Sequence, residues 1–187
     1  EVQWYTKSDY NRIINEIKKY VSESHITNEM SDQEKAYRVA RYIINHIDYD
    51  INVYGQTIEQ ALFEHKTVCA GYSKTYALIC RYIGIDCDYV YSPDHHAWNY
   101  VKMGKYYYIT DLTRAYFKVQ ANINSGTFDM FREYDYLSNN SKENIKAVFN
   151  TNEYKRIHPV DTIDYFDRCE KEGKDYLTRL ELSKLPE

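Results

Sequence analysis

The sequence contains no long hydrophobic run and no concentration of positive charge. None of its apolar stretches approaches the roughly 18 residues that a membrane-spanning helix requires. Its formal net charge is -4, and Lys and Arg residues are interspersed with Asp and Glu along the whole chain. Binding to a phosphate backbone requires a basic stripe, which this chain does not show. We therefore expect no membrane span and no nucleic-acid partner.

Cysteine is scarce and irregularly spaced. The chain has four cysteines, and none forms a CxxC pair or a regular series: Cys69, Cys80, Cys87 and Cys169. This distribution argues against a disulfide scaffold and against a zinc knuckle. We expect at least one free thiol, no structural metal and no cofactor.

Internal repeats and low-complexity tracts are also absent, and the chain does not begin with methionine. Glu1 as first residue indicates a processed chain or a fragment, from which a targeting signal would have been removed. A length of 187 residues suits one domain with a sizeable core. We expect a single domain over 1–187, with an N-terminal helix in 1–30, a core over 31–116 and a C-terminal extension over 117–187 that wraps the core.

Tyrosine, in contrast, is abundant, with 22 Tyr beside 6 Phe and 2 Trp. An aromatic core built from tyrosine must place hydroxyl groups near water or a hydrogen-bond partner. Compositional drift explains the excess without any function. A surface that binds carbohydrate or peptide is the alternative, since tyrosine suits wet interfaces.

Helices are predicted at both ends of the chain. Apolar residues recur at helical spacing over 10–21, with Ser8 or Asp9 available as the N-cap. A helix of mixed charge is predicted over 160–185, before Pro186. The N-terminal segment should pack through its isoleucine face.

Two further helices precede the middle of the chain. Ser31 and Glu34 have the spacing of a capping box, and the apolar stripe that follows ends near 48–50. Thr57 begins a shorter segment with the same spacing, which predicts a short helix over 57–65.

A central helix is predicted from Cys69 to Ile83, where Gly84 ends it. A helix N-terminus lowers the pKa of a thiol, because its unpaired N–H groups and the helix dipole favour negative charge. Cys69 is therefore a candidate nucleophile. The small residues Ala70 and Gly71 would leave room for a substrate backbone. A buried core cysteine is the alternative reading, because cysteine is among the most buried residue types.

A β-hairpin is predicted after this helix. Its strands cover 95–101 and 106–110. We expect Met103 and Gly104 to form the two-residue turn between them. A bulge at Gly104 is the alternative, and it would shift the pairing by one residue.

The expected register places His96 directly opposite Asp111 on one face of the hairpin, where the carboxylate can hold the imidazole. His95 is adjacent in the strand, so its side chain should point to the other face. A purely structural ion pair is an alternative. A zinc ion bound by Cys69, His96 and Asp111 is another, although no fourth ligand stands at a recognisable spacing.

Several segments in this order resemble the transglutaminase-like superfamily, which shares the papain-type architecture. The resemblance covers about 38–116, and its specificity lies in the order and spacing of individually weak motifs. The matching segments are Ile47-Asp48-Tyr49-Asp50, Ala61-Leu62, Thr67-Val68-Cys69-Ala70-Gly71-Tyr72-Ser73, Gly84-Ile85, His96-Ala97-Trp98-Asn99 and Tyr107-Tyr108-Ile109-Thr110-Asp111-Leu112-Thr113.

This resemblance implies an α+β fold, in which a helical half carries Cys69 at a helix start and packs on a small antiparallel β-sheet. It implies Cys69 as nucleophile, His96 as general base and acid, and Asp111 as the residue that orients the imidazole. The site is expected in the cleft between the two halves.

Three further residues are candidates around this site. Trp98 matches the family's tryptophan after the histidine; it would wall the site, or it is simply a core residue. Arg114 stands with Ala115 where family members commonly show Trp followed by Asp or Gly, and it would favour an acidic group on the substrate. The backbone N–H of Cys69 and the side chain of Gln56 are candidate oxyanion donors.

The function expected is cysteine-dependent acyl transfer or hydrolysis at amide bonds of a protein or peptide, through a thioester. The acceptor, water or an amine, stays open. The alternative is a noncatalytic adhesion or binding module that retains the fold and holds a polysaccharide or protein. The resemblance also suggests a secreted or cell-surface protein, with a cell-surface polymer as a possible partner.

Overall fold

A computed structural model of the chain describes residues 6–53, 56–92, 95–123, 136–137 and 159–186. The loops expected around 139–140 and 151–152 lie outside this range. None of the helices in the described part of the chain combines the length and the apolar character that crossing a bilayer requires.

The first helix, α1 (Lys7–Glu23), buries its apolar face through Ile13, Ile17 and Tyr20. Its N-cap is Thr6, so the expected cap at Ser8 or Asp9 is wrong. The side chains of Thr6 and Asp9 instead form a capping box, in which Asp9 is the third helical residue. A capping box satisfies two otherwise unpaired N–H groups at once, which favours the earlier start.

The second helix, α2 (Asp32–His46), begins after Ser31 as expected, because the Ser31 hydroxyl accepts a hydrogen bond from the N–H of Glu34. The short helix expected over 57–65 is a π-helical turn, η1 (Gln60–Glu64), and the hydroxyl of Thr57 accepts a hydrogen bond from the N–H of Gln60.

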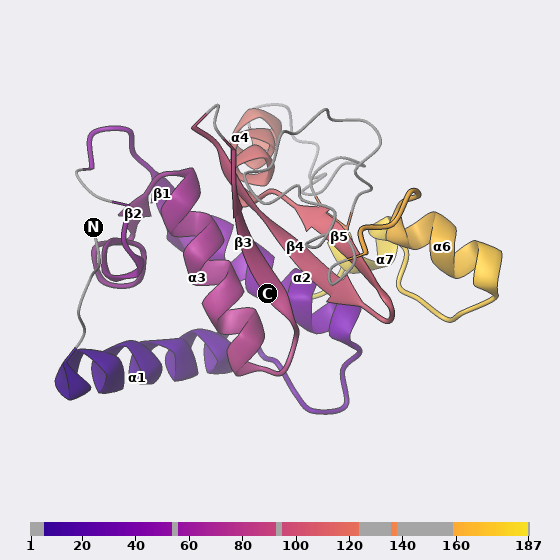
Figure 1. Ribbon diagram of the computed structural model, residues 1–187, viewed down its shortest axis with the longest axis horizontal. Helices are drawn as coiled ribbons and strands as arrows, with labels where there is room; N and C mark the ends of the chain where they lie inside the picture. Colours follow the sequence, from indigo (N-terminus) through magenta and orange to yellow (C-terminus); the bar gives the residue numbers. More distant parts are fainter. Residues whose placement is uncertain (1–5, 54–55, 93–94, 124–135, 138–158, 187) are drawn as a thin grey trace.

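The central helix, α3 (Cys69–Tyr82), contacts both halves of the fold. Its buried residues include Tyr72, Tyr76, Ile79 and Cys80 from the expected stripe. Gly84 follows at a φ of 87°, a conformation that glycine adopts without steric cost. In Figure 1, α3 lies between α1 and the sheet, so the prediction of a buried, central helix is confirmed.

The main sheet contains β3 (Cys87–Tyr91), β4 (Ala97–Met103) and β5 (Tyr106–Thr110), antiparallel in that order. A two-residue parallel pair, β1 (Asp48–Tyr49) with β2 (Lys66–Thr67), lies beside the start of α3. Helices on one side and a small antiparallel sheet on the other give the α+β fold that the sequence predicts.

The expected register of the hairpin is wrong by two residues. Met103 pairs with Tyr106 at the end of the ladder, so the turn residues are Gly104 and Lys105. Gly104 has a φ of 65°, which a hairpin turn demands and methionine disfavours. Met103 stays in β4 and is buried in the core. A slip of two residues, unlike a slip of one, leaves every side chain on the expected face.

The C-terminal part contains α4 (Leu112–Ile123), α6 (Tyr165–Glu172) and α7 (Arg179–Ser183). The single helix expected over 160–185 is thus two helices, because Gly173 ends α6 at a φ of 62° and Thr178 with Glu181 caps a new start. This part contacts α2 through a pair of hydrogen bonds between Gln33 and Leu177. The proposed division of the chain at residues 30 and 116 stays a prediction.

A buried carboxylate joins the C-terminal part to β5. Asp161 is 2% exposed, and it binds the hydroxyl of Tyr108 at 2.7 Å and the guanidinium of Arg168 through two bonds of 2.7 Å. Burial opposes the ionisation of Asp161, but the hydrogen bonds from Arg168, Tyr108 and backbone N–H groups outweigh it and lower its pKa.

Replacing Asp161 by asparagine is expected to lower the free energy of unfolding by about 3 kcal/mol, because it leaves a paired cation without its partner. A lowered folded-state pKa gives stability that is present above the unfolded-state pKa and lost as the pH falls through the folded-state value. The difference between the proteins should therefore shrink in acid. Urea unfolding at pH 7 and at pH 3 measures it, and an equal difference at both pH values would contradict the assignment.

Candidate active site

Cys69 is the first residue of α3, and its side chain is buried but keeps a small solvent exposure. Val68 caps the helix without a side-chain hydrogen bond, and the first turn contains no acidic residue. Cys69 is 6% exposed, and its Sγ lies 3.9 Å from the carbonyl oxygen of His95. All four cysteines are free thiols, and the other three are more deeply buried.

Ala70 and Gly71 were expected to leave room for a substrate backbone, and the structure gives them a different role. Both are buried, so neither opens a path for a substrate. A Cβ on Gly71 would lie 1.7 Å from Oγ1 of Thr67. Glycine is therefore required because the first turn of α3 packs directly on β2.

His96 and Asp111 come together at the end of the hairpin, one residue outside each strand. Nε2 of His96 lies 2.7 Å from Oδ2 of Asp111. With the observed register, the two residues are diagonal neighbours on one face rather than directly opposite. Diagonal positions on one face are still within reach of long side chains.

Asp111 is held in place by the helix that follows it. Its Oδ1 accepts a hydrogen bond from the N–H of Arg114 at 3.1 Å, in the pattern of an N-cap. Nε of Arg114 lies 3.4 Å from Oδ2 of the same carboxylate. The start of α4 and the hairpin together therefore orient this carboxylate toward His96.

Cys69 and His96 influence each other's ionisation. The hydrogen bond to Asp111 raises the pKa of His96 to about 9, and the contact with Cys69 adds to it. Burial opposes ionisation of the Cys69 thiol, but hydrogen bonds from His96 and from the N–H groups of Ala97 and Ala70 outweigh it, so the pKa of Cys69 is lowered. Because Nε2 binds Asp111, Nδ1 is the nitrogen of His96 that faces the thiol. The pair favours a thiolate beside an imidazolium.

Asn99 joins the two halves that carry this pair, and sequence reasoning gave it no role. Its Nδ2 donates to the carbonyl oxygens of Ser73 in α3 at 2.8 Å and of Asp88 in β3 at 3.2 Å. This cross-link holds the helix of Cys69 against the strand that follows His96. The signals that could have identified it are its place in the segment His96-Ala97-Trp98-Asn99 and its polar character in an otherwise apolar strand.

His95 precedes the strand instead of lying in it. Its φ of 61° is left-handed, its ring is exposed, and Nδ1 lies 2.8 Å from the hydroxyl of Tyr91. The expectation that only His96 faces Asp111 agrees with this geometry, although the backbone, and not strand alternation, separates the two rings.

Trp98 supports the imidazole from behind. Its ring stacks on that of His96 with centroids 5.9 Å apart and an interplanar angle of 26°. Trp98 is 1% exposed and belongs to an apolar cluster with Val90, Tyr100, Tyr107 and Ile109. It is thus a core residue that also backs the site.

Two further residues, Arg114 and Gln56, were expected near the site. Arg114 contacts Asp111 as described, and a role in substrate charge selection stays a prediction. Gln56 is exposed, and its main-chain carbonyl accepts a hydrogen bond of 2.8 Å from Lys74. A role for its side chain as an oxyanion donor also stays a prediction.

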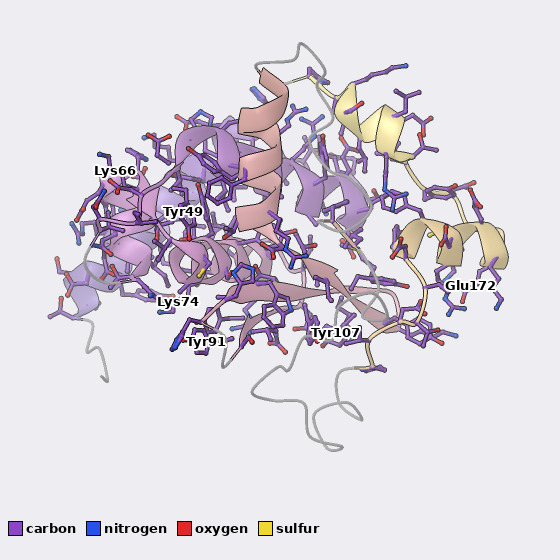
Figure 2. The ribbon with its side chains drawn as sticks, turned by 90° about the horizontal axis from the view of Figure 1, so that it is seen from above. Tyr49, Lys66, Lys74, Tyr91, Tyr107 and Glu172 are labelled. Atoms are coloured by element: carbon purple, nitrogen blue, oxygen red, sulfur yellow. The ribbon has the colours of Figure 1, made fainter. Side chains whose placement is uncertain are left out.

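Three tyrosines that sequence reasoning did not place approach Cys69. Tyr49 is close enough to Cys69 for the charge of the thiolate to raise its pKa, in addition to the larger effect of burial. Tyr89 and Tyr91 of β3 pack against the small apolar cluster of Cys69, Ala70 and Ala97. Figure 2 shows Tyr49, Lys74 and Tyr91 in one half of the molecule, away from Tyr107 and Glu172. No group of three or more His, Cys, Asp or Glu side chains in the described ranges is arranged to hold a metal ion.

Two solved structures are similar to this chain, and the first of them shares its fold. One is a TGase, matched with a TM-score of 0.52 at 22% identity, over 58% of this chain and 33% of that one. The other is a candidate cysteine protease from Cytophaga hutchinsonii, matched with a TM-score of 0.47 at 21% identity, over 56% of this chain and 39% of that one. This chain thus covers less than half the length of either protein. No curated protein matches the sequence significantly.

A family comparison matches the part of the chain that contains the candidate site. The model of the transglutaminase-like superfamily matches residues 19–112, which are 94 of the 187 residues. The matched range includes Cys69, His96 and Asp111, and the fold around them is the mixed helical and antiparallel arrangement of the matched TGase. The chain belongs to the transglutaminase-like superfamily.

Proposed function

We propose that this chain is a cysteine-dependent acyl-transfer enzyme that acts on amide bonds of a protein or peptide, with Cys69 as nucleophile. The observation that supports this most directly is the hydrogen bond of 2.7 Å between His96 and Asp111 beside the start of α3, together with the effect of His96, which lowers the pKa of Cys69. A nucleophile, a base within hydrogen-bond reach and a third group that orients the base are the arrangement that thiol catalysis requires.

In this mechanism the thiolate of Cys69 attacks the amide carbonyl carbon, and the carbonyl π electrons move to the oxygen. His96 then gives its proton to the amine nitrogen as the C–N bond breaks, which leaves a thioester on Cys69. Neutral His96 next takes a proton from the acceptor as the acceptor attacks the thioester carbon, and the C–S bond then breaks, so that Cys69 leaves as a thiolate beside the imidazolium. Water as acceptor gives hydrolysis, whereas an amine gives a new amide bond.

The surroundings of the thiol fit a peptide more closely than a small metabolite. Tyr89 and Tyr91 line one side of Cys69, and Nζ of Lys74 lies 5.6 Å from the centre of the Tyr89 ring. Phe117 is 52% exposed and lies 4.9 Å from Tyr49, measured between ring centroids. Partly exposed aromatic side chains around a nucleophile suit an extended chain with apolar groups.

The rate at which iodoacetamide alkylates Cys69, measured against pH by site-resolved mass spectrometry, tests the proposal. We expect alkylation with an inflection below the ordinary thiol pKa of about 8.5, because His96 lowers the pKa of Cys69. In His96→Ala the inflection should move above its native position, since burial then opposes ionisation with less compensation.

His95→Ala is the matched control, because the His95 ring binds Tyr91 and not Asp111. It should leave the inflection where it is in the native protein. An inflection near the ordinary value in the native protein, unchanged by His96→Ala, would contradict the enzyme proposal. The noncatalytic binding module would then be the better reading.

A further inference from the structure

Lys74 carries a positive charge close to the turn that contains the nucleophile. It lies in α3 one turn after Ala70, which packs in the small apolar cluster with Cys69 and Ala97. Side chains four residues apart lie on the same face of a helix, and a helical side chain leans toward the N-terminus of its helix. Nζ of Lys74 donates a hydrogen bond of 2.8 Å to the carbonyl oxygen of Gln56. The ammonium is therefore directed toward the first turn of α3 and held there.

Tyr89 connects this ammonium with the surroundings of the thiol. Tyr89 and Tyr91 point to one face of β3, and Val90 points to the other, where it belongs to a separate apolar cluster. Both tyrosines pack against the cluster that contains Cys69. Nζ of Lys74 lies 5.6 Å from the centre of the Tyr89 ring, within the range of a cation–π contact. One aromatic ring thus contacts both the lysine and the cluster of the nucleophile.

No carboxylate among the described residues pairs with Lys74. The ion pairs formed by lysines in those residues are those of Lys19, Lys66, Lys105 and Lys174. Lys74 is partly buried, and this burial lowers its pKa. An ammonium has three N–H donors, and the carbonyl of Gln56 accepts from one of them. Within the same part of the chain, two donors are therefore available to a ligand.

A partly buried cation that is held by an aromatic ring and a carbonyl group is suited to bind an anion, because a charge-assisted hydrogen bond is stronger than a neutral one. We propose that Lys74 and Tyr89 form a carboxylate-binding subsite beside Cys69, and that the preferred protein or peptide substrate has a carboxylate close to the reacting amide. This inference rests on the proposed function. The two remaining N–H groups of Lys74 bind the carboxylate oxygens, while Tyr89 and the carbonyl of Gln56 hold the ammonium in place.

Two alkylating reagents of nearly equal size separate recognition of charge from reactivity of the thiol. Iodoacetamide is neutral and iodoacetate carries a carboxylate; both form a C–S bond with Cys69 and release iodide. Lys74→Met keeps an unbranched apolar side chain and removes the charge. We expect it to lower the iodoacetate rate on the order of fivefold, and to leave the iodoacetamide rate within about twofold of the native rate. Lys74→Arg keeps the charge and should keep most of the native ratio of the two rates.

Lys102→Met is the matched control. Nζ of Lys102 also lies over a tyrosine ring, 5.8 Å from the centre of Tyr107, and Figure 2 shows Tyr107 apart from Lys74 and Tyr91. The ratio of the two alkylation rates in Lys102→Met should therefore equal the native ratio. A native melting temperature of Lys74→Met would show that this variant folds.

Short peptides identify the source of the carboxylate. The probes are Ala-Gln-Ala blocked at both ends, blocked Ala-Glu-Ala, and Ala-Gln-Ala with a free C-terminus, each competing with iodoacetamide for Cys69. We expect one of the two anionic peptides to protect Cys69 better than the neutral peptide, and Lys74→Met to abolish that difference. Protection by the glutamate peptide identifies an acidic side chain, and protection by the third peptide identifies a C-terminal carboxylate.

Two results would overturn the subsite. An unchanged ratio of the iodoacetate and iodoacetamide rates in Lys74→Met would do so, since a lysine that only supports the Gln56 segment affects both reagents alike. Equal protection by the three peptides would do so as well. Neither result touches the proposed function as long as the iodoacetamide inflection of Cys69 lies below the ordinary thiol pKa. An ordinary inflection that His96→Ala leaves unchanged would overturn the proposed function, and this inference with it.

Discussion

Replacing Cys69 by alanine is expected to reduce acyl transfer on the order of 10⁵-fold, because every step of the proposed mechanism passes through a bond to its sulfur. Neither His96 nor Asp111 can take its place: the imidazole is held between two partners, and the carboxylate is buried behind it. Release of p-nitrophenolate from p-nitrophenyl acetate measures the effect. Any remaining rate should equal the rate of the same reaction with His96 and Cys69 both replaced.

The other thiols provide the control for this prediction. Cys169 is 1% exposed in α6, and burial raises its pKa, so it should neither react nor contribute to activity. Cys169→Ala should keep native acyl transfer, whereas Cys69→Ala should keep the native melting temperature and lose the activity. Substantial acyl transfer by Cys69→Ala would show that another group is the nucleophile.

Replacing Asp111 by asparagine is expected to lower the rate of acyl transfer by about 10⁴-fold, the effect of removing the carboxylate that orients a catalytic imidazole. The carboxylate accepts from Nε2 of His96 and also from the N–H of Arg114, so the amide would keep some of the geometry and lose the charge. Without that charge the imidazolium is less stable.

The pH profile of acyl transfer shows whether Asp111 acts through its negative charge or only by holding His96 in place. The pKa of His96 is raised to about 9, mainly by Asp111. Native activity should therefore rise as Cys69 ionises and fall as the pH passes about 9 and the imidazolium loses its proton. Because the two groups are coupled, the two limbs report the pair and not either residue alone. In Asp111→Asn the alkaline limb should move to lower pH.

Asp161→Asn is the matched control, because Asp161 is also a buried carboxylate but binds Tyr108 and Arg168 instead of a histidine. It should destabilise the protein and leave the alkaline limb in place. A native alkaline limb in Asp111→Asn would contradict the role of Asp111 and identify its contact with His96 as structural.

Local patterns in the sequence were sufficient to predict most of the secondary structure. Apolar residues at helical spacing identified α1, α2 and α3, and Ser31 and Gly84 marked a beginning and an end. These signals act within one or two helical turns, so they require no knowledge of the rest of the chain. The same local reasoning missed Thr6 as a cap, because Ser8 and Asp9 stood close by, and it missed Gly173 as a break.

The sequence by itself determined which residues could form the site, because Cys69 at a helix start and His96 with Asp111 on one face of a hairpin follow from local periodicity. The tertiary structure decided how they meet. The turn at Gly104 sets the register, Asn99 holds α3 against the sheet, and the two-residue pair of β1 and β2 brings Tyr49 to Cys69. The contacts of Asn99 and Tyr49 join residues far apart in the chain, and two-residue strands are too short to show a period. Only packing of the whole domain determines them.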